Sequence, residues 1–173
     1  MKIEEIRNSW RQLVAQKEFK QVAELLRQSP KRDKLMQRGR ELCAHTFVFD
    51  HPWDMERCLT PHTMETMNWN QVFNDDEEWT FMLNRMDYWS VLAKAALISQ
   101  DTRYLDQAKD FLLDWIEQHP RIELSLSTRT LDTGIRVVNM LECAMFLEAA
   151  EKLNDEELTL ILTSIKNQLT YLK

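Results

Sequence analysis

The sequence predicts an all-α protein built from antiparallel helical hairpins. Three observations carry this prediction: the 173 residues include only 2 Gly and 4 Pro, apolar residues recur at helical spacing along most of the chain, and 44% of residues are hydrophobic. So few turn-forming residues disfavour a β-sandwich. A chain of this length can form one domain with a substantial core.

Residues 1–45 are expected to form N-terminal helices. The first of these has an apolar stripe at spacings of three or four, made by Ile3, Ile6, Trp10 and Leu13. Pro30 marks a break before a basic helix that carries Gly39.

Residues 46–76 lack a sustained helical period and are expected to form one long aromatic loop. Pro, Asn and Asp residues and the short run TFVF indicate turns and extended segments. The loop also holds Trp53 and Trp69, which are large rings for a solvated linker. Loops of this length in a compact domain are often functional.

Residues 77–173 are expected to form helical hairpins. The first helix should run from Glu77 to about Ser99, and Asp101 is a candidate N-cap for the next, which Pro120 ends. The apolar positions of the first helix are Trp79, Met82, Met86, Trp89, Ala93, Ala96 and Leu97.

Two details mark the last two helices. Gly134 lies inside the helix that carries Leu131 to Ala149, where Gly costs roughly 1 kcal/mol relative to Ala. A close helix–helix contact is one reason to tolerate it. Asn154 and Glu157 have the spacing of a capping box at the start of the final helix. Such hairpins can build a bundle, a solenoid or an α/α toroid.

Composition excludes several classes of function. The net charge of -6 argues against nonspecific nucleic-acid binding, and no apolar run approaches the ~20 residues of a membrane span. The first residues lack the apolar core of a secretory signal, which predicts a cytoplasmic protein, although removal of a leader would leave the same sequence. Three scattered Cys residues indicate a reducing compartment.

The sequence gives little support for a metal site or for a catalytic nucleophile. His45, His51, Cys58 and His62 lie within eighteen positions, but their spacing fits no zinc finger or ribbon. The sequence contains no glycine-rich phosphate loop, G-x-S-x-G elbow or H-E-x-x-H motif. We therefore expect no metal and no cofactor.

The segment EWTFMLNRMDYW, residues 78–89, is the strongest candidate for a binding surface. Sugars stack on aromatic rings, and Arg can grip a uronate carboxylate with two parallel hydrogen bonds. The residues that could build such a wall are Trp53, Trp69, Trp79, Asn84, Arg85, Tyr88 and Trp89. The alternative is that these rings are ordinary core.

The order of motifs resembles the N-terminal helical region of the heparinase II/III-like polysaccharide lyases over roughly residues 45–150. The motifs that carry the resemblance are Asn84–Arg85, Asp101–Tyr104, Trp115–Ile116 with Pro120, and Gly134–Ile135–Arg136. The resemblance implies part of an incomplete α/α toroid. It also implies cleavage of uronate-containing polysaccharides by β-elimination, in which the C5 proton leaves as the bond at C4 breaks.

The resemblance assigns no catalytic role to any residue of this chain, because the family's catalytic Asn, Tyr and His are expected beyond the equivalent of residue 173. It implies instead a cleft wall, for which the candidate substrate-binding residues are Asn84, Arg85, Trp79, Tyr88, Arg136 and Trp53. An ion pair of Arg136 with Asp87 or Asp132 is the alternative for that residue.

The first hypothesis is therefore the N-terminal substrate-cleft domain of a lyase, inactive alone. Its expected partners are an acidic poly- or oligosaccharide and the C-terminal part of the same enzyme, with no nucleic acid and no membrane. A second hypothesis is a non-catalytic helical interaction module. A third is a fragment of an α/α hydrolase that uses carboxylates such as Asp87.

Overall fold

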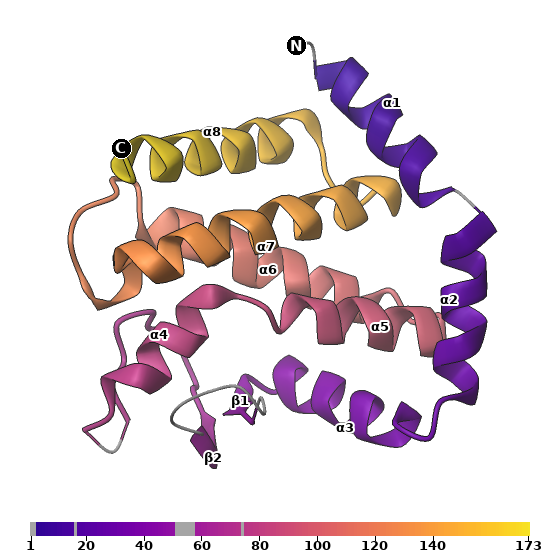
Figure 1. Cartoon of the computed structure of the whole chain (residues 1–173), viewed down its shortest axis with the longest axis horizontal. Helices are drawn as coiled ribbons and strands as arrows, with labels where there is room; N and C mark the ends of the chain where they lie inside the picture. The colour runs from indigo at the N-terminus through magenta and orange to yellow at the C-terminus, as the bar shows by residue number, and fades with distance from the viewer. Residues whose placement is uncertain (1–2, 16, 51–57, 74) are drawn as a thin grey trace.

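A computed structural model describes residues 3–15, 17–50, 58–73 and 75–173, without the side chains of 17–20 and 58. Helices dominate this part of the chain, which confirms the all-α class (Figure 1). The helices are α1 (Ile3–Val14), α2 (Lys17–Gln28), α3 (Arg32–Cys43), α4 (Glu77–Arg85), α5 (Trp89–Ser99), α6 (Arg103–Gln118), α7 (Thr130–Ala149) and α8 (Asp155–Tyr171), with a 3-10 turn η1 (Leu126–Thr128).

The helices form a stack in which α7 is central. α5 pairs with α6, α7 pairs with α8, and α1 and α2 run across the ends of these hairpins (Figure 1). α3 packs against α5, while α4 packs against the first half of α7. The α/α toroid remains a prediction. Across the described ranges, no helix is both long and apolar enough to cross a membrane.

The close helix contact in this fold occurs at Gly39 of α3. A Cβ atom there would lie 2.8 Å from the Cβ of Ala95 and 3.0 Å from Tyr104 Cε1, so only glycine lets α3 approach α5 and α6 so closely. At Gly134 of α7, by contrast, an added Cβ would meet no heavy atom within 4 Å in the described structure. The expectation of a close contact at Gly134 is therefore wrong within this chain.

A two-stranded antiparallel sheet interrupts the expected long loop. β1 (Thr46–Phe49) pairs with β2 (Cys58–Thr63), and the register shifts between Phe47 and Phe49. Both phenylalanines are buried, as β-strand alternation allows. The extended structure predicted for TFVF is thus confirmed.

The helix expected from Glu77 to Ser99 is two helices. Met86 takes the left-handed conformation (φ 57°) at the end of α4, and α5 begins at Trp89. An apolar run gives no sign of such a break because its spacing continues through it. Four of the apolar positions predicted for this helix are buried, namely Trp79, Met82, Met86 and Trp89.

The N-caps of α6 and α8 lie within one residue of the positions that the sequence predicts. Asn154 and Glu157 form the expected reciprocal capping box of α8. The N-cap of α6 is Thr102 rather than Asp101, but Asp101 Oδ1 still accepts a hydrogen bond of 3.0 Å from the backbone N–H of Arg103.

Candidate functional site

Asn84 lies at the centre of a closed polar network. Its side chain is fully buried, and its Nδ2 donates to the carbonyl oxygens of Trp69 (2.7 Å) and Thr80 (2.8 Å). Its Oδ1 accepts a hydrogen bond of 2.9 Å from Trp115 Nε1. Asn84 therefore fastens the segment before α4 to α6. The described chain thus encloses Asn84 in its core, and a role for Asn84 in a sugar cleft stays a prediction.

Arg136 of α7 completes the same network and is also fully buried. It donates to the carbonyl oxygens of Asn84 (3.0 Å) and Ser127 (2.8 Å), and its other donors reach Gln168 and Thr133. The guanidinium carbon lies 4.2 Å from the ring centre of Trp115, within cation–π range.

The alternative of an ion pair between Arg136 and Asp87 or Asp132 is wrong, because its hydrogen bonds go to carbonyls, an amide and a hydroxyl. Burial lowers the pKa of Arg136 to about 9, so the group still carries its charge at neutral pH. We name Asn84, Trp115, Ser127, Arg136 and Gln168 the closed network.

His119 extends the closed network at the end of α6. Its ring stacks on Trp115 with centroids 4.1 Å apart. Because a carbonyl only accepts, His119 Nδ1–H donates to the Trp115 carbonyl (2.7 Å), which leaves Nε2 to accept from the Ser127 hydroxyl (2.7 Å). Burial lowers the pKa of His119, and the charge of Arg136 acts in the same direction. Ser127 is fully buried, so this pair offers no exposed nucleophile.

Trp79 and Tyr88 pack in a cluster of aromatic rings. Trp79 meets Phe49 edge to face at 5.5 Å, and Tyr88 meets Phe47 in the same way at 5.2 Å. Burial raises the pKa of Tyr88 well above its ordinary value, with a smaller contribution from Asp87. The Trp79 Nε1 and Tyr88 hydroxyl groups have no hydrogen-bond partner in the described structure. Trp53, the remaining candidate, lies outside the described residues.

Arg85 follows Asn84 directly but reaches the surface. Its side chain is 18% exposed, and its Nε donates to Asp132 Oδ1 at 2.7 Å. A second nitrogen reaches Glu78 Oε1 at 3.1 Å. Of the five candidates that the structure describes, Arg85 is the least buried. Substrate contact by any of them remains a prediction.

Arg129 binds the second carboxylate oxygen of Asp132, so that two arginines share this carboxylate. Its Nε donates to Asp132 Oδ2, and the bond to this carboxylate raises the pKa of Arg129. Its side chain is 37% exposed, and its guanidinium carbon lies 3.6 Å from the ring centre of Phe81. Asp132 itself is fully buried. We name Glu78, Phe81, Arg85, Arg129 and Asp132 the arginine cluster.

The arginine cluster has the chemistry to hold an anion next to a flat apolar surface. Asp132 orients both guanidinium groups, so less conformational freedom is lost when a ligand binds. Arg129 keeps exposed N–H donors, and its partner ring Phe81 supplies a face for stacking. Guanidinium N–H groups of this kind suit the oxygens of a carboxylate or a sulfate.

A separate hollow of about 690 Å³ lies between α6 and α8. Its wall includes Leu113, Ile116, Leu160 and His119, and none of the predicted site residues that the structure describes lines it. No three His, Cys, Asp or Glu side chains among the described residues converge as a metal site does; His51 lies outside those residues. The hollow therefore shares no residue with the arginine cluster.

The sequence of this chain matches the family model described as heparinase II/III N-terminus over residues 8–173. The chain belongs to the heparinase II/III N-terminus family. Searches of curated proteins and of solved structures found no significant match. The match confirms the resemblance and includes every residue of both the closed network and the arginine cluster.

Within this heparinase II/III N-terminal domain, Phe81 and Arg129 are the site residues that sequence reasoning missed. The spacing of Arg129 and Asp132 on one helical turn is a visible signal for an ion pair. The approach of Arg85 to Asp132 spans 47 positions and arises only from the packing of α4 on α7.

Proposed function

We propose that this heparinase II/III N-terminal domain forms the substrate-cleft wall of a polysaccharide lyase that cleaves uronate-containing glycans by β-elimination. The family match over residues 8–173 is the observation that carries the proposal. The all-α fold and the partly exposed arginine cluster agree with it. The catalytic groups would belong to a further part of the same polypeptide.

The arginine cluster would contribute to β-elimination by binding the uronate carboxylate. Removal of the C5 proton places negative charge on the adjacent carboxylate, and positive groups held close to it lower the barrier. Arg129 can donate to a carboxylate from its exposed edge, while Arg85 is held by Glu78 and Asp132. The proton transfers themselves need a base and an acid, which this proposal does not assign within residues 1–173.

An experiment on the isolated chain tests this function. The chain is titrated with uronate oligosaccharides, and the absorbance of unsaturated uronate is followed in the same samples. We expect binding without turnover. Turnover would contradict the placement of the catalytic groups elsewhere, and failure to bind any uronate oligosaccharide would contradict the cleft-wall function.

A helical interaction module is the second candidate, and an exposed apolar face on α7 favours it. Leu131 and Val138 are more than half exposed on this face. The titration separates the candidates, because a module without sugar chemistry would not respond to uronate oligosaccharides.

A further inference from the structure

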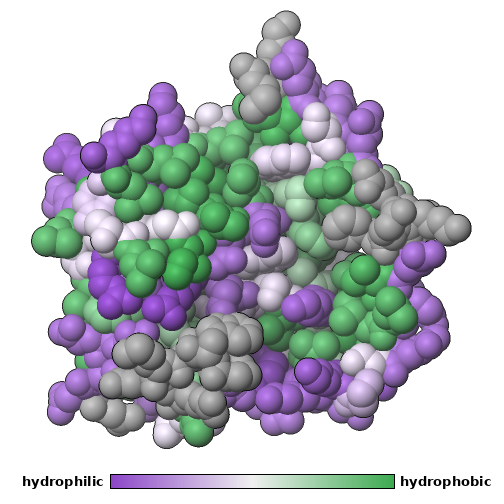
Figure 2. All heavy atoms as spheres, in the orientation of Figure 1, coloured by the Kyte–Doolittle hydropathy of each residue, from purple (hydrophilic) through white to green (hydrophobic). Residues whose placement is uncertain are grey.

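The two carboxylates of the arginine cluster differ in their contact with solvent. Asp132 is fully buried, whereas the side chain of Glu78 is 28% exposed. Glu78 Oε1 nevertheless accepts a hydrogen bond of 3.1 Å from Arg85 Nη2. In Figure 2 a hydrophilic area lies over α4 and the start of α7, the two helices that carry these residues. Glu78 is thus a surface carboxylate bound to an arginine of the cluster.

Three partners within the chain hold the guanidinium of Arg85. Nε donates to Asp132 Oδ1, Nη1 donates to Met82 Sδ, and Nη2 donates to Glu78 Oε1. Asp132 and Met82 are buried, so a ligand could replace either of them only by opening the core. Of these three partners, Glu78 is therefore the one that a ligand from solvent can replace.

The Glu78 carboxylate also acts on Arg129. The hydrogen bond to Asp132 is the largest cause of the raised pKa of Arg129, and the charge of Glu78 acts in the same direction. A ligand carboxylate in the place of Glu78 would therefore meet Nη2 of Arg85 and the exposed guanidinium of Arg129. Charge-assisted hydrogen bonds of this kind are stronger than bonds to a neutral hydroxyl.

The charges of the cluster favour exchange over simple addition. Arg85 and Arg129 balance Asp132 and Glu78, so one more carboxylate would leave an excess of negative charge unless Glu78 moved away. The movement costs little, because a partly exposed ion pair contributes little to stability. Glu78 also lies in the first turn of α4, where the helix dipole favours a negative charge even without Arg85.

We infer that Glu78 occupies the place of the ligand carboxylate in the free arginine cluster and that a uronate carboxylate displaces it on binding. This inference rests on the proposed function. Glu78 then sets the affinity of the site, because it competes with the ligand for Arg85. Binding rotates Glu78 toward solvent and leaves Asp132 in place.

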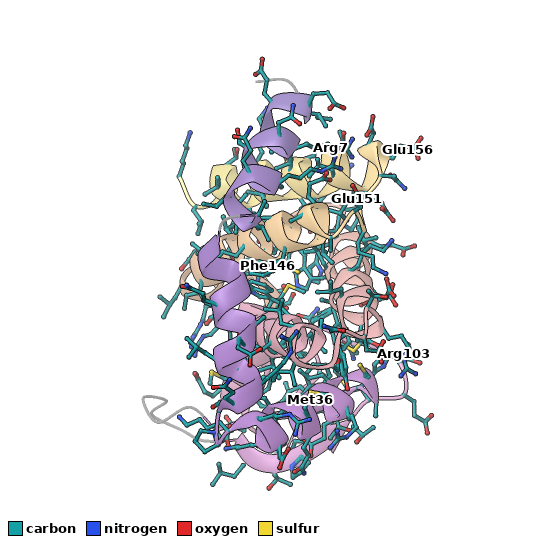
Figure 3. All side chains as sticks on the ribbon, turned by 90° about the vertical axis from the view of Figure 1, so that its right-hand side faces the viewer. Arg7, Met36, Arg103, Phe146, Glu151 and Glu156 are labelled. Carbon is teal, nitrogen blue, oxygen red and sulfur yellow. The ribbon has the colours of Figure 1, made fainter. Side chains whose placement is uncertain are left out.

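A second pair of arginines that share a buried carboxylate provides a control. Arg7 and Arg11 of α1 both form ion pairs with Glu148, and the exposed Glu4 reaches Arg7 at 3.7 Å. Figure 3 shows Arg7 on α1, at this end of the molecule. Glu148 lies in the last turn of α7 and Asp132 in the first, about 24 Å apart along the helix. Glu4→Gln therefore removes a similar outer carboxylate far from the arginine cluster.

The test titrates the 173-residue chain with a glucuronate-containing oligosaccharide and compares the wild type, Glu78→Gln and Glu4→Gln. Gln has the size of Glu and still accepts a hydrogen bond from Arg85, so the comparison isolates the charge. We expect Glu78→Gln to bind roughly threefold more tightly or better and Glu4→Gln to bind like the wild type. An equal gain for both variants, or an unchanged or weaker affinity for Glu78→Gln, would overturn the inference.

Two further measurements separate competition from a change in folding or in space. The melting temperature of Glu78→Gln should be close to that of the wild type, because the ion pair it removes is partly exposed. The same oligosaccharide with its carboxylates reduced to alcohols should bind Glu78→Gln no more tightly than the wild type. An equal gain for this neutral ligand would contradict competition between carboxylates.

Sulfate as a second probe distinguishes failure of the inference from failure of the proposed function. If no uronate oligosaccharide binds, but sulfate binds Glu78→Gln more tightly than the wild type, competition by Glu78 is supported and the cleft-wall function is contradicted. If the wild type and Glu78→Gln bind the uronate oligosaccharide equally, the cleft-wall function is supported and competition by Glu78 is overturned.

Discussion

Asn84 and Arg85 are neighbours in the sequence, yet they belong to two regions with opposite character. Asn84 is part of the closed network, where every polar atom of its side chain has a partner and water is excluded. Arg85 is part of the arginine cluster, where two guanidinium groups share a buried carboxylate and Arg129 faces solvent. The comparison shows that two adjacent residues of one motif can serve different ends, one in a buried hydrogen-bond network and one in a partly exposed group of charged side chains.

The closed network should therefore control stability, and its largest expected effect is at Arg136. Arg136→Met would leave two backbone carbonyls and Gln168 without their donor, so we expect a loss of about 3 kcal/mol in the free energy of unfolding. Urea unfolding measures this loss. Arg103→Met is the control, because Arg103 is highly exposed and, among the residues that the structure describes, forms an ion pair with Asp101 alone. A loss below about 1 kcal/mol for Arg136→Met would contradict the structural role.

Asn84→Leu should have the next largest effect. The change leaves Trp115 Nε1 and the Trp69 carbonyl unpaired in the core, which we expect to cost about 2 kcal/mol in the free energy of unfolding. Asn167→Leu on the exposed surface of α8 is the matched control and should cost little. If the two variants unfold at the same urea concentration, Asn84 is not the centre of the network.

Titration of His119 should change the free energy of unfolding less than these two substitutions do. The pKa of His119 is lowered in the folded state, so the unfolded chain takes up a proton at a higher pH than the folded chain. The stability that this group contributes is complete above its unfolded pKa of about 6.5 and is lost as pH falls below that value.

Urea unfolding at pH 7.5, 6.5 and 5.5 measures this trend, and we expect the free energy of unfolding to be lower at pH 5.5 than at pH 7.5. His119→Gln should flatten the trend. A wild-type stability that rises on acidification, or a slope unchanged in His119→Gln, would show that another group is responsible.

Sequence reasoning predicted what depends on local periodicity. The apolar stripes located the helices, and the Asn154–Glu157 pattern located the start of α8. The break at Met86 was not predictable, because nothing in an apolar run signals a left-handed residue.

The candidate site was predictable only in part. Asn84 is buried because Trp69 and Trp115, which are 15 and 31 positions away, supply its partners, and no local pattern contains that information. Arg136 resembled a surface or interhelical arginine in sequence, yet the packing of α4, α6 and α8 around α7 encloses it. Arg85 was identified as a candidate from motif order, whereas Arg129 needed the shared Asp132 to be recognised.

Arg129 is the residue at which a difference in function between the two regions can be measured most directly. We would titrate wild type, Arg129→Ala and Arg103→Ala with one uronate oligosaccharide and compare their affinities. Arg103 is the control, since it is an arginine that pairs with a nearby Asp but lies outside the arginine cluster. The proposed function predicts at least tenfold weaker binding for Arg129→Ala and unchanged binding for Arg103→Ala. Equal affinity of all three proteins would contradict the assignment of the arginine cluster as the uronate site.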